Sequence, residues 1–155
     1  MTKVDAKLVK QLREQTGARV LDCKKALEEA QGDLAKAEQL VAEKGLARAE
    51  KNQDRATQAG SIVSYVHTNG KVGAMVELQC ETDFVAQNEE FQTLGKDIAM
   101  QVVAMNPQDT SELLSQEFIR DPSVKIETLV KTLSGKIGER MVLARFVRFE
   151  LGEEE

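Results

Sequence analysis

The sequence predicts an α+β fold, in which a bundle of three short helices precedes a small three-stranded antiparallel sheet with packed helices. Three observations support this prediction. Apolar residues recur at helical spacing three times in the first 50 residues, an Asn-Gly pair separates two strand-like runs, and two further helical stretches precede a C-terminal strand pattern. The 155-residue chain is long enough for one substantial core and a small second domain.

Each of the first three helices has an apolar face and a stop or start signal. Gly17 and Gly32 end the first and second helices, because glycine readily adopts the left-handed conformation that closes a helix. Asp33 is placed to cap the third helix. The three apolar faces comprise Leu8, Val9 and Leu12; Val20, Cys23, Leu27 and Ala30; and Leu34, Ala37, Leu40 and Val41. A bundle this small resembles the ubiquitin-associated class of three-helix domains.

Between Gly45 and Gly60 the chain is rich in alanine and charge and poor in large apolar residues. This composition indicates a helical extension that frays into a connection between two domains. We therefore divide the chain into a three-helix domain at 1–50, a linker at 51–60 and an α+β domain at 61–155.

Residues Ser61–Cys80 have the pattern of a β-hairpin. Two apolar runs flank Asn69-Gly70, a pair that tolerates positive φ at both positions. The sequence therefore predicts a two-residue type I′ turn here.

Two helices and a strand account for most of the remaining chain. Helical periodicity runs from about Gln87 to Met105 and stops at Asn106-Pro107, because proline lacks the amide needed to continue. Residues 108–124 are polar, and we expect a loop with one helical turn. A second helix follows at Ile126–Ile137 and a strand at Met141–Leu151.

Composition and charge exclude several functional classes. Two cysteines and one histidine without neighbouring ligands provide no metal site, and we expect no cofactor. Residues 1–55 carry 12 Lys and Arg against 10 Asp and Glu, and the remainder carries 9 against 16, so neither part has the basic surface of a nucleic-acid binder. The sequence has no membrane span or secretion signal, which predicts a cytoplasmic protein with a protein partner.

Asp83 and Phe84 are the first candidates for function. They lie in the run Cys80-Glu81-Thr82-Asp83-Phe84-Val85, where a strand pattern gives way to a helical one. A ring and a carboxylate at an exposed corner form a short, stiff probe suited to entering another protein. The alternative, Phe84 in the core with Asp83 capping the helix, is equally compatible with composition and periodicity.

Three segments closely resemble the bacterial elongation factor Ts family. They are the run from Leu8 to Ala18 followed by Leu21-Asp22-Cys23-Lys24-Lys25-Ala26-Leu27, the run from Cys80 to Ala86, and the ending Arg145-Phe146-Val147-Arg148-Phe149-Glu150-Leu151-Gly152. Three matches in the family's order are far more specific than one short motif. The resemblance implies a guanine-nucleotide exchange factor for elongation factor Tu, which performs no bond chemistry and is not an enzyme.

The same resemblance assigns two sets of residues to the partner. Thr82, Asp83, Phe84 and Val85 would form a wedge that enters the GTPase beside its magnesium site. The three-helix domain would dock on the nucleotide-binding domain through Arg13, Val20 and Leu21, with Lys24 and Lys51 steering it. Two other interpretations remain: Val20 and Leu21 fill the bundle, and the lysines form an ordinary solvated surface.

The second face of the predicted sheet has no covering layer within the chain. An exposed apolar face of this kind predicts association, and we expect a homodimer through the sheet. The chain resembles a short, single-module form of the family. The competing function is a non-catalytic adaptor that captures a peptide or ubiquitin-like ligand through its three helices, and such an adaptor would survive mutation of Phe84.

Overall fold

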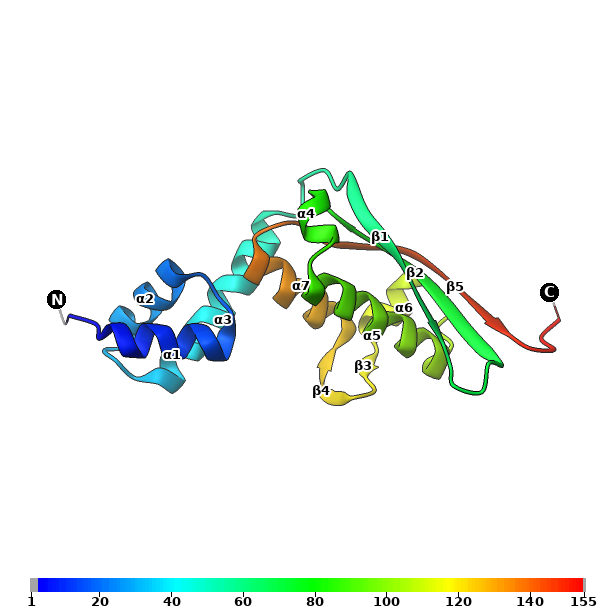
Figure 1. The fold of residues 1–155 in the computed structure, drawn as a ribbon, viewed down its shortest axis with the longest axis horizontal. Coiled ribbons are helices and arrows are strands. Elements are labelled where there is room, and N and C mark those ends of the chain that lie inside the picture. The colour runs from blue at the N-terminus through cyan, green and yellow to red at the C-terminus, as the bar shows by residue number, and fades with distance from the viewer. Residues whose placement is uncertain (1–2, 155) are drawn as a thin grey trace.

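The computed structural model describes residues 3–154 and confirms the α+β class (Figure 1). Its N-terminal part consists of three helices: α1 (Ala6–Thr16), α2 (Val20–Glu29) and α3 (Leu34–Lys51). The rest contains strands β1 (Ala59–Val66), β2 (Val72–Cys80) and β5 (Val142–Glu150), a four-residue helix α4 (Asp83–Ala86) and the longer helices α5 (Glu89–Met105) and α7 (Ile126–Ile137). The three-helix part and the tip of the β1–β2 hairpin lie at opposite ends of the molecule.

The ends of the first three helices follow the signals in the sequence. The Asp5 carboxylate accepts a hydrogen bond from the amide of Lys7, and that of Asp33 accepts one from the amide of Lys36 at 3.1 Å. Gly17 ends α1 with a φ of 64° and donates its amide to Arg13. The helices enclose a small core that consists of Leu12, Ala18, Cys23, Ala26, Leu27, Ala30 and Ala37.

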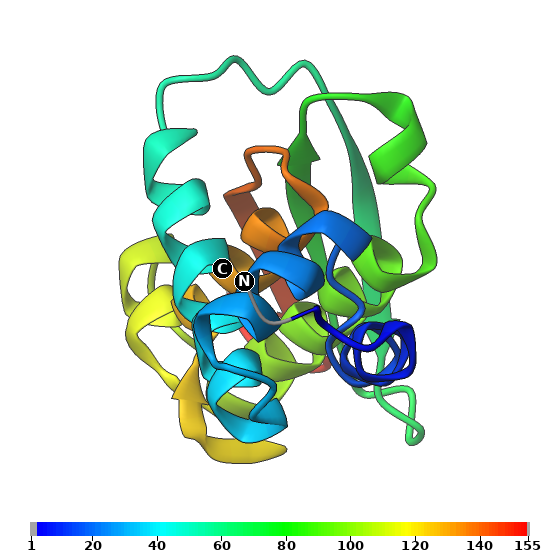
Figure 2. The same cartoon turned by 90° about the vertical axis from the view of Figure 1, so that its left-hand side faces the viewer.

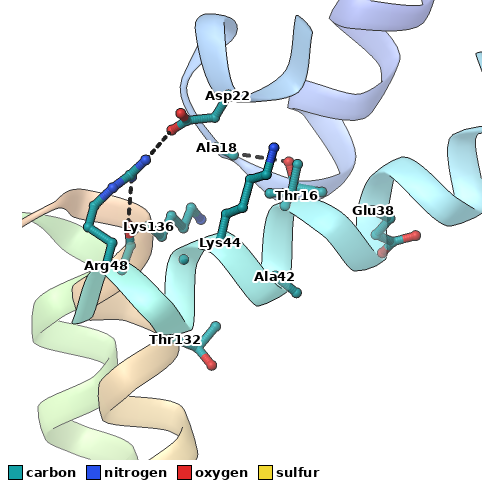
Figure 3. A pocket seen from close by; sticks show the side chains of 12 residues that line it. Thr16, Ala18, Asp22, Glu38, Ala42, Lys44, Arg48, Thr132 and Lys136 are labelled. Carbon is teal, nitrogen blue, oxygen red and sulfur yellow. Dashed lines mark hydrogen bonds and ion pairs between the residues drawn. The ribbon is translucent and has the colours of Figure 1, made fainter. Parts of the chain in front are cut away.

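Helix α3 extends beyond the bundle and packs on α7. The two helices cross at Gly45 and Gly135, where a Cβ on Gly135 would overlap the backbone carbonyl of Gly45. Arg48 donates to the Gly135 carbonyl at 3.0 Å and to the Asp22 carboxylate at 3.0 Å (Figure 3). The second half of α3 thus lies against the α+β part instead of fraying.

The sheet has the strand order β1-β2-β5, and both pairings are antiparallel. The predicted type I′ turn is wrong, because only Gly70 of the Asn-Gly pair has a positive φ, at 69°. The Gly70 amide donates to the carbonyl of His67, and the strands close at His67 and Val72. The connection is therefore longer than two residues, and one left-handed glycine suffices to reverse the chain.

One face of the sheet is covered by helices and holds the larger core. Helix α5 packs so closely on β1 that a Cβ on Gly95 would lie 2.6 Å from a methyl carbon of Val63. The fully buried large side chains of this core are Val76, Leu78, Phe91, Ile98, Val102, Leu113 and Ile126. The other face carries exposed apolar side chains: Ile62, Val66, Met75, Val147 and Phe149.

The predicted loop at 108–124 contains more structure than one helical turn. It forms helix α6 (Thr110–Ser115) and two short strands, β3 (Glu117–Phe118) and β4 (Asp121–Lys125), which pair with each other. The buried amide of Gln101 on α5 explains how so polar a segment is held. Its nitrogen donates to the Glu117 carbonyl at 3.0 Å, and its oxygen accepts from the Ile119 amide at 2.9 Å.

Candidate partner-binding site

Helix α4 forms the corner that the sequence singled out. Strand β2 ends at Cys80, two residues follow, and α4 begins at Asp83. The N-cap of α4 is Thr82, not Asp83: the Thr82 hydroxyl accepts a hydrogen bond from the amide of Val85 at 3.4 Å. This leaves the Asp83 carboxylate free of the capping role.

Phe84 points into solvent and is 91% exposed. The alternative of a core phenylalanine is therefore wrong, and the reason is local. In a single helical turn only one side can face the core, and here Val85 and Ala86, both buried, take that side. Asp83 and Phe84 form the outer side, with Thr82 exposed beside them.

The backbone before α4 is tied to the turn between α7 and β5. The Glu139 carboxylate accepts from the amides of Glu81 at 3.1 Å and Thr82 at 3.0 Å, and from the Thr82 hydroxyl at 2.8 Å. In return, the Glu81 carboxylate accepts from the Arg140 amide at 2.7 Å. Sequence reasoning missed Glu139, because an acidic residue after a helix-ending glycine carries no signal of a contact 57 residues away.

Two further groups brace the same corner. The thiol of Cys80 donates to the Thr82 carbonyl at 3.2 Å, and burial, with a smaller effect of the nearby Glu139 charge, raises the pKa of Cys80 to about 11. Arg55, from the connection between α3 and β1, pairs with the Glu81 carboxylate at 3.5 Å. The corner is thus bonded to two distant parts of the chain, the turn after α7 and the connection before β1, and to the adjoining end of β2.

A second candidate surface lies on the three-helix part, where α1 and α2 meet. Val20 is 46% and Leu21 is 69% exposed, so neither fills the bundle. A shallow groove beside them is lined by Val4, Ala6, Val9, Lys10, Arg13, Val20 and Lys24. The structure therefore brings Arg13, Val20 and Lys24 together, and Leu21 follows Val20 on the exposed side of α2.

Lys51 lies apart from this groove, at the C-terminal end of α3. Arg19, which precedes the exposed pair, instead holds the start of α2 on the α+β part, since its guanidinium donates to the Ile137 carbonyl at 2.8 Å. A pocket between the two parts is lined by side chains from α2, α3 and α7, among them Asp22, Lys44, Arg48 and Thr132 (Figure 3).

Helix α2 lies in the three-helix part at one end of the molecule, and α4 lies at the end of the sheet nearer to it (Figures 1 and 2). The described residues 3–154 contain no group of three His, Cys, Asp or Glu side chains placed to hold a metal ion. Within the same range, no helix combines the length and apolarity that crossing a membrane requires.

Comparison with known proteins gives one consistent result. The family described as Elongation factor TS matches residues 81–155. The chain is 39% identical to an elongation factor Ts of Synechococcus sp. (strain RCC307), over 99% of this chain and 92% of that protein. It is 40% identical to those of Oleidesulfovibrio alaskensis and Thermotoga neapolitana, over 98% of this chain and 100% and 99% of theirs. The aligned lengths, 195 to 199 positions, exceed the 155 residues here, so these relatives carry additional residues. This chain belongs to the elongation factor Ts family.

Proposed function

We propose that this protein is a guanine-nucleotide exchange factor for elongation factor Tu and acts in the cytoplasm during translation elongation. The observation that carries the proposal is the exposed ring of Phe84, held on a corner that is bonded to two distant parts of its own chain and to the end of β2. A large apolar side chain kept in water by a stiff frame contributes nothing to its own fold. It is well placed to enter a partner.

The proposed mechanism weakens the partner's hold on GDP. A GTPase binds its nucleotide through backbone amides around the phosphates and through Mg²⁺, which bridges phosphate oxygens to the protein. Phe84 displaces packed side chains beside this site, and the Asp83 carboxylate competes for hydrogen bonds that hold the switch region. Loss of the metal-binding arrangement then speeds GDP release, with no bond made or broken by this protein.

Burial of the Phe84 ring in the partner can supply enough free energy to offset a large part of the nucleotide's affinity. An aromatic anchor that becomes buried in an interface contributes on the order of 2 to 4 kcal/mol, and about 1.4 kcal/mol changes an equilibrium constant tenfold. The coupling is reciprocal: the factor weakens GDP binding by the same ratio as GDP weakens binding of the factor. Rebinding of nucleotide, chiefly GTP when it is in excess, therefore releases the factor.

In this scheme the two parts of the chain divide the work. Residues 1–50 dock on the nucleotide-binding domain through Arg13, Val20 and Leu21, and Lys24 and Lys51 provide longer-range attraction. Residues 51–60 connect to the α+β part at 61–155, which carries the wedge, Thr82–Val85. Support comes from the exposure of Val20 and Leu21.

The decisive experiment measures release of labelled GDP from elongation factor Tu. We expect the wild type to accelerate release, and Phe84→Ala to lower the maximal rate about a hundredfold, as for the loss of about 3 kcal/mol. Asp83→Ala should lower it less. Met105→Ala, which shortens another exposed apolar side chain at the end of α5, is the control and should match the wild type. Equal acceleration by the wild type and Phe84→Ala would refute the wedge, and no acceleration by the wild type would favour the adaptor.

We also propose that the protein forms a homodimer through the outer face of its sheet. Ile62, Met75, Val147 and Phe149 give this face an apolar centre, and Glu77 and Arg145, paired at 3.4 Å, add both charges to it. A twofold axis sets such a face against its own copy, which lets each acid meet the other protomer's arginine. Light scattering at micromolar concentration should give a dimer for the wild type and a monomer for Phe149→Glu. A monomeric wild type would exclude the dimer.

A further inference from the structure

We propose that Glu139 is a positioning residue for the wedge: its carboxylate fixes the backbone from which Phe84 projects. The inference rests on the proposed exchange function and assigns to it a residue outside the wedge and outside the three-helix part. Glu139 lies just after α7, and its side chain reaches the two residues that join β2 to α4.

The bonds to Glu139 replace the sheet and helix bonds that the amides of Glu81 and Thr82 do not make. One carboxylate oxygen accepts from both amides and the other accepts from the Thr82 hydroxyl, so both oxygens are engaged on two consecutive residues. The three bonds fix the direction in which the chain leaves β2.

Glu139 is itself held in place. Its carbonyl accepts from the Ser134 hydroxyl at 2.6 Å, and the next amide, that of Arg140, donates to the Glu81 carboxylate at 2.7 Å. The two acids thus exchange bonds across the junction, each accepting from the other's backbone segment. A carboxylate on a rotating side chain could not orient a neighbour, but one that is anchored on both sides can.

A wedge needs this support because α4 is too short to be stable alone. A helix of four residues lies far below the length at which isolated helices form in water, so its order comes from its surroundings. When Phe84 presses against a partner, an unsupported turn would yield and the ring would move aside. The expected consequence of losing Glu139 is therefore a slower step after binding, with binding through the three-helix part preserved.

The test uses the full-length chain and titrates it against elongation factor Tu loaded with labelled GDP. Glu139→Ala should lower the maximal rate of GDP release roughly tenfold and leave the half-saturating concentration within about twofold, which corresponds to losing about 1.4 kcal/mol at the exchange step alone. Glu139→Gln should retain most of the rate. Its amide oxygen can accept from both amides, and its NH₂ can donate to the Thr82 hydroxyl, which also accepts.

Glu112→Ala is the matched control. The Glu112 carboxylate also accepts from a backbone amide, that of Gln108 at 2.8 Å, but it does so on α6, away from the corner. This variant loses one carboxylate–amide bond of the same kind and should exchange nucleotide like the wild type. A general loss of stability from removing a capping acid would appear in both alanine variants.

Three kinetic results would overturn the proposal. They are a wild-type maximal rate in Glu139→Ala, a loss confined to its half-saturating concentration, and a Glu139→Gln variant as slow as Glu139→Ala, which would implicate charge instead of bond geometry. Hydrogen exchange of the free proteins adds a direct reading: the Glu81 and Thr82 amides should exchange faster in Glu139→Ala, and unchanged exchange also overturns it. Failure of the wild type to accelerate GDP release would refute the exchange function itself. That outcome is visible without any Glu139 variant, so it is distinguishable from failure of the Glu139 proposal.

Discussion

The corner at Phe84 and the exposed surface of α2 are built in opposite ways. Phe84 is a single ring on a four-residue helix whose approach is bonded to Glu139, Cys80 and Arg55. Val20 and Leu21 stand on a ten-residue helix beside a shallow groove, and the side chain of its N-cap, Arg19, bonds the Ile137 carbonyl and caps none of the helix's own amides. The exposed surface of α2 is suited to binding the partner, whereas the rigidly held Phe84 ring is suited to displacing side chains within it. The two regions should therefore fail differently when mutated.

The largest effect is expected where the two regions are joined. In Gly135→Ala the new methyl group would overlap the Gly45 carbonyl, so α3 and α7 must separate and the distance between groove and corner changes. Over-packing typically costs 1–3 kcal/mol, and we expect about 3 kcal/mol because the obstacle is backbone. Urea unfolding should show this loss, and GDP release should be impaired in both its maximal rate and its half-saturating concentration.

Gly45→Ala is the natural control for that substitution. A Cβ at Gly45 would lie 3.8 Å from the nearest atom of Gly135, an ordinary contact, and alanine is favoured over glycine within a helix by up to about 1 kcal/mol. The same crossing should therefore tolerate a methyl group from one side and reject it from the other. Equal stability of the two variants would mean that the crossing does not set the relative position of the two parts.

Alkaline pH should lower the free energy of unfolding through Cys80, which lies beside the Phe84 corner. Burial raises the pKa of both thiols, and that of Cys80, next to the corner, is raised from 9.0 to about 11. As the pH rises, the Cys80 thiol loses its proton in the unfolded chain before it does so in the folded protein. The neutral buried thiol therefore contributes fully to the free energy of unfolding below pH 9, and this contribution disappears as the pH rises toward 11. Between pH 8 and 11 the wild type should lose about 2 kcal/mol more of its unfolding free energy than Cys80→Ala does. Equal losses by urea titration would show that the thiol ionises freely in the fold.

Much of the fold was predictable because its elements carry local signals. Asp33 and Gly17 mark helix ends by their own chemistry, and periodicity located α7 and β5. The errors arose where distant contacts decide. The segment at 108–124 is ordered by Gln101 from α5, and the hairpin turn has a single left-handed residue, although its Asn-Gly pair suits two.

The candidate site shows the same division between local and distant information. The sequence identified Phe84 but left its side of α4 open, because one helical turn is too short for periodicity to show which side is buried. Val85 takes the buried side instead. Glu139 had no signal at all, since its role depends on a turn that approaches Glu81 only in the folded chain.

The smallest predicted effect is that of Leu21→Ala, and it tests the difference between the α2 surface and the Phe84 corner most directly. Leu21→Ala removes exposed apolar area from the docking surface without touching the corner, and should raise the half-saturating concentration for GDP release about tenfold, or about 1.4 kcal/mol, at an unchanged maximal rate. Ile119→Ala, another exposed aliphatic residue in the α+β part, should change neither value. This result is the mirror image of the one expected for Glu139→Ala. If Leu21→Ala instead lowered the maximal rate, α2 would take part in displacing the nucleotide. The α2 surface and the Phe84 corner would then not divide binding and nucleotide release between them.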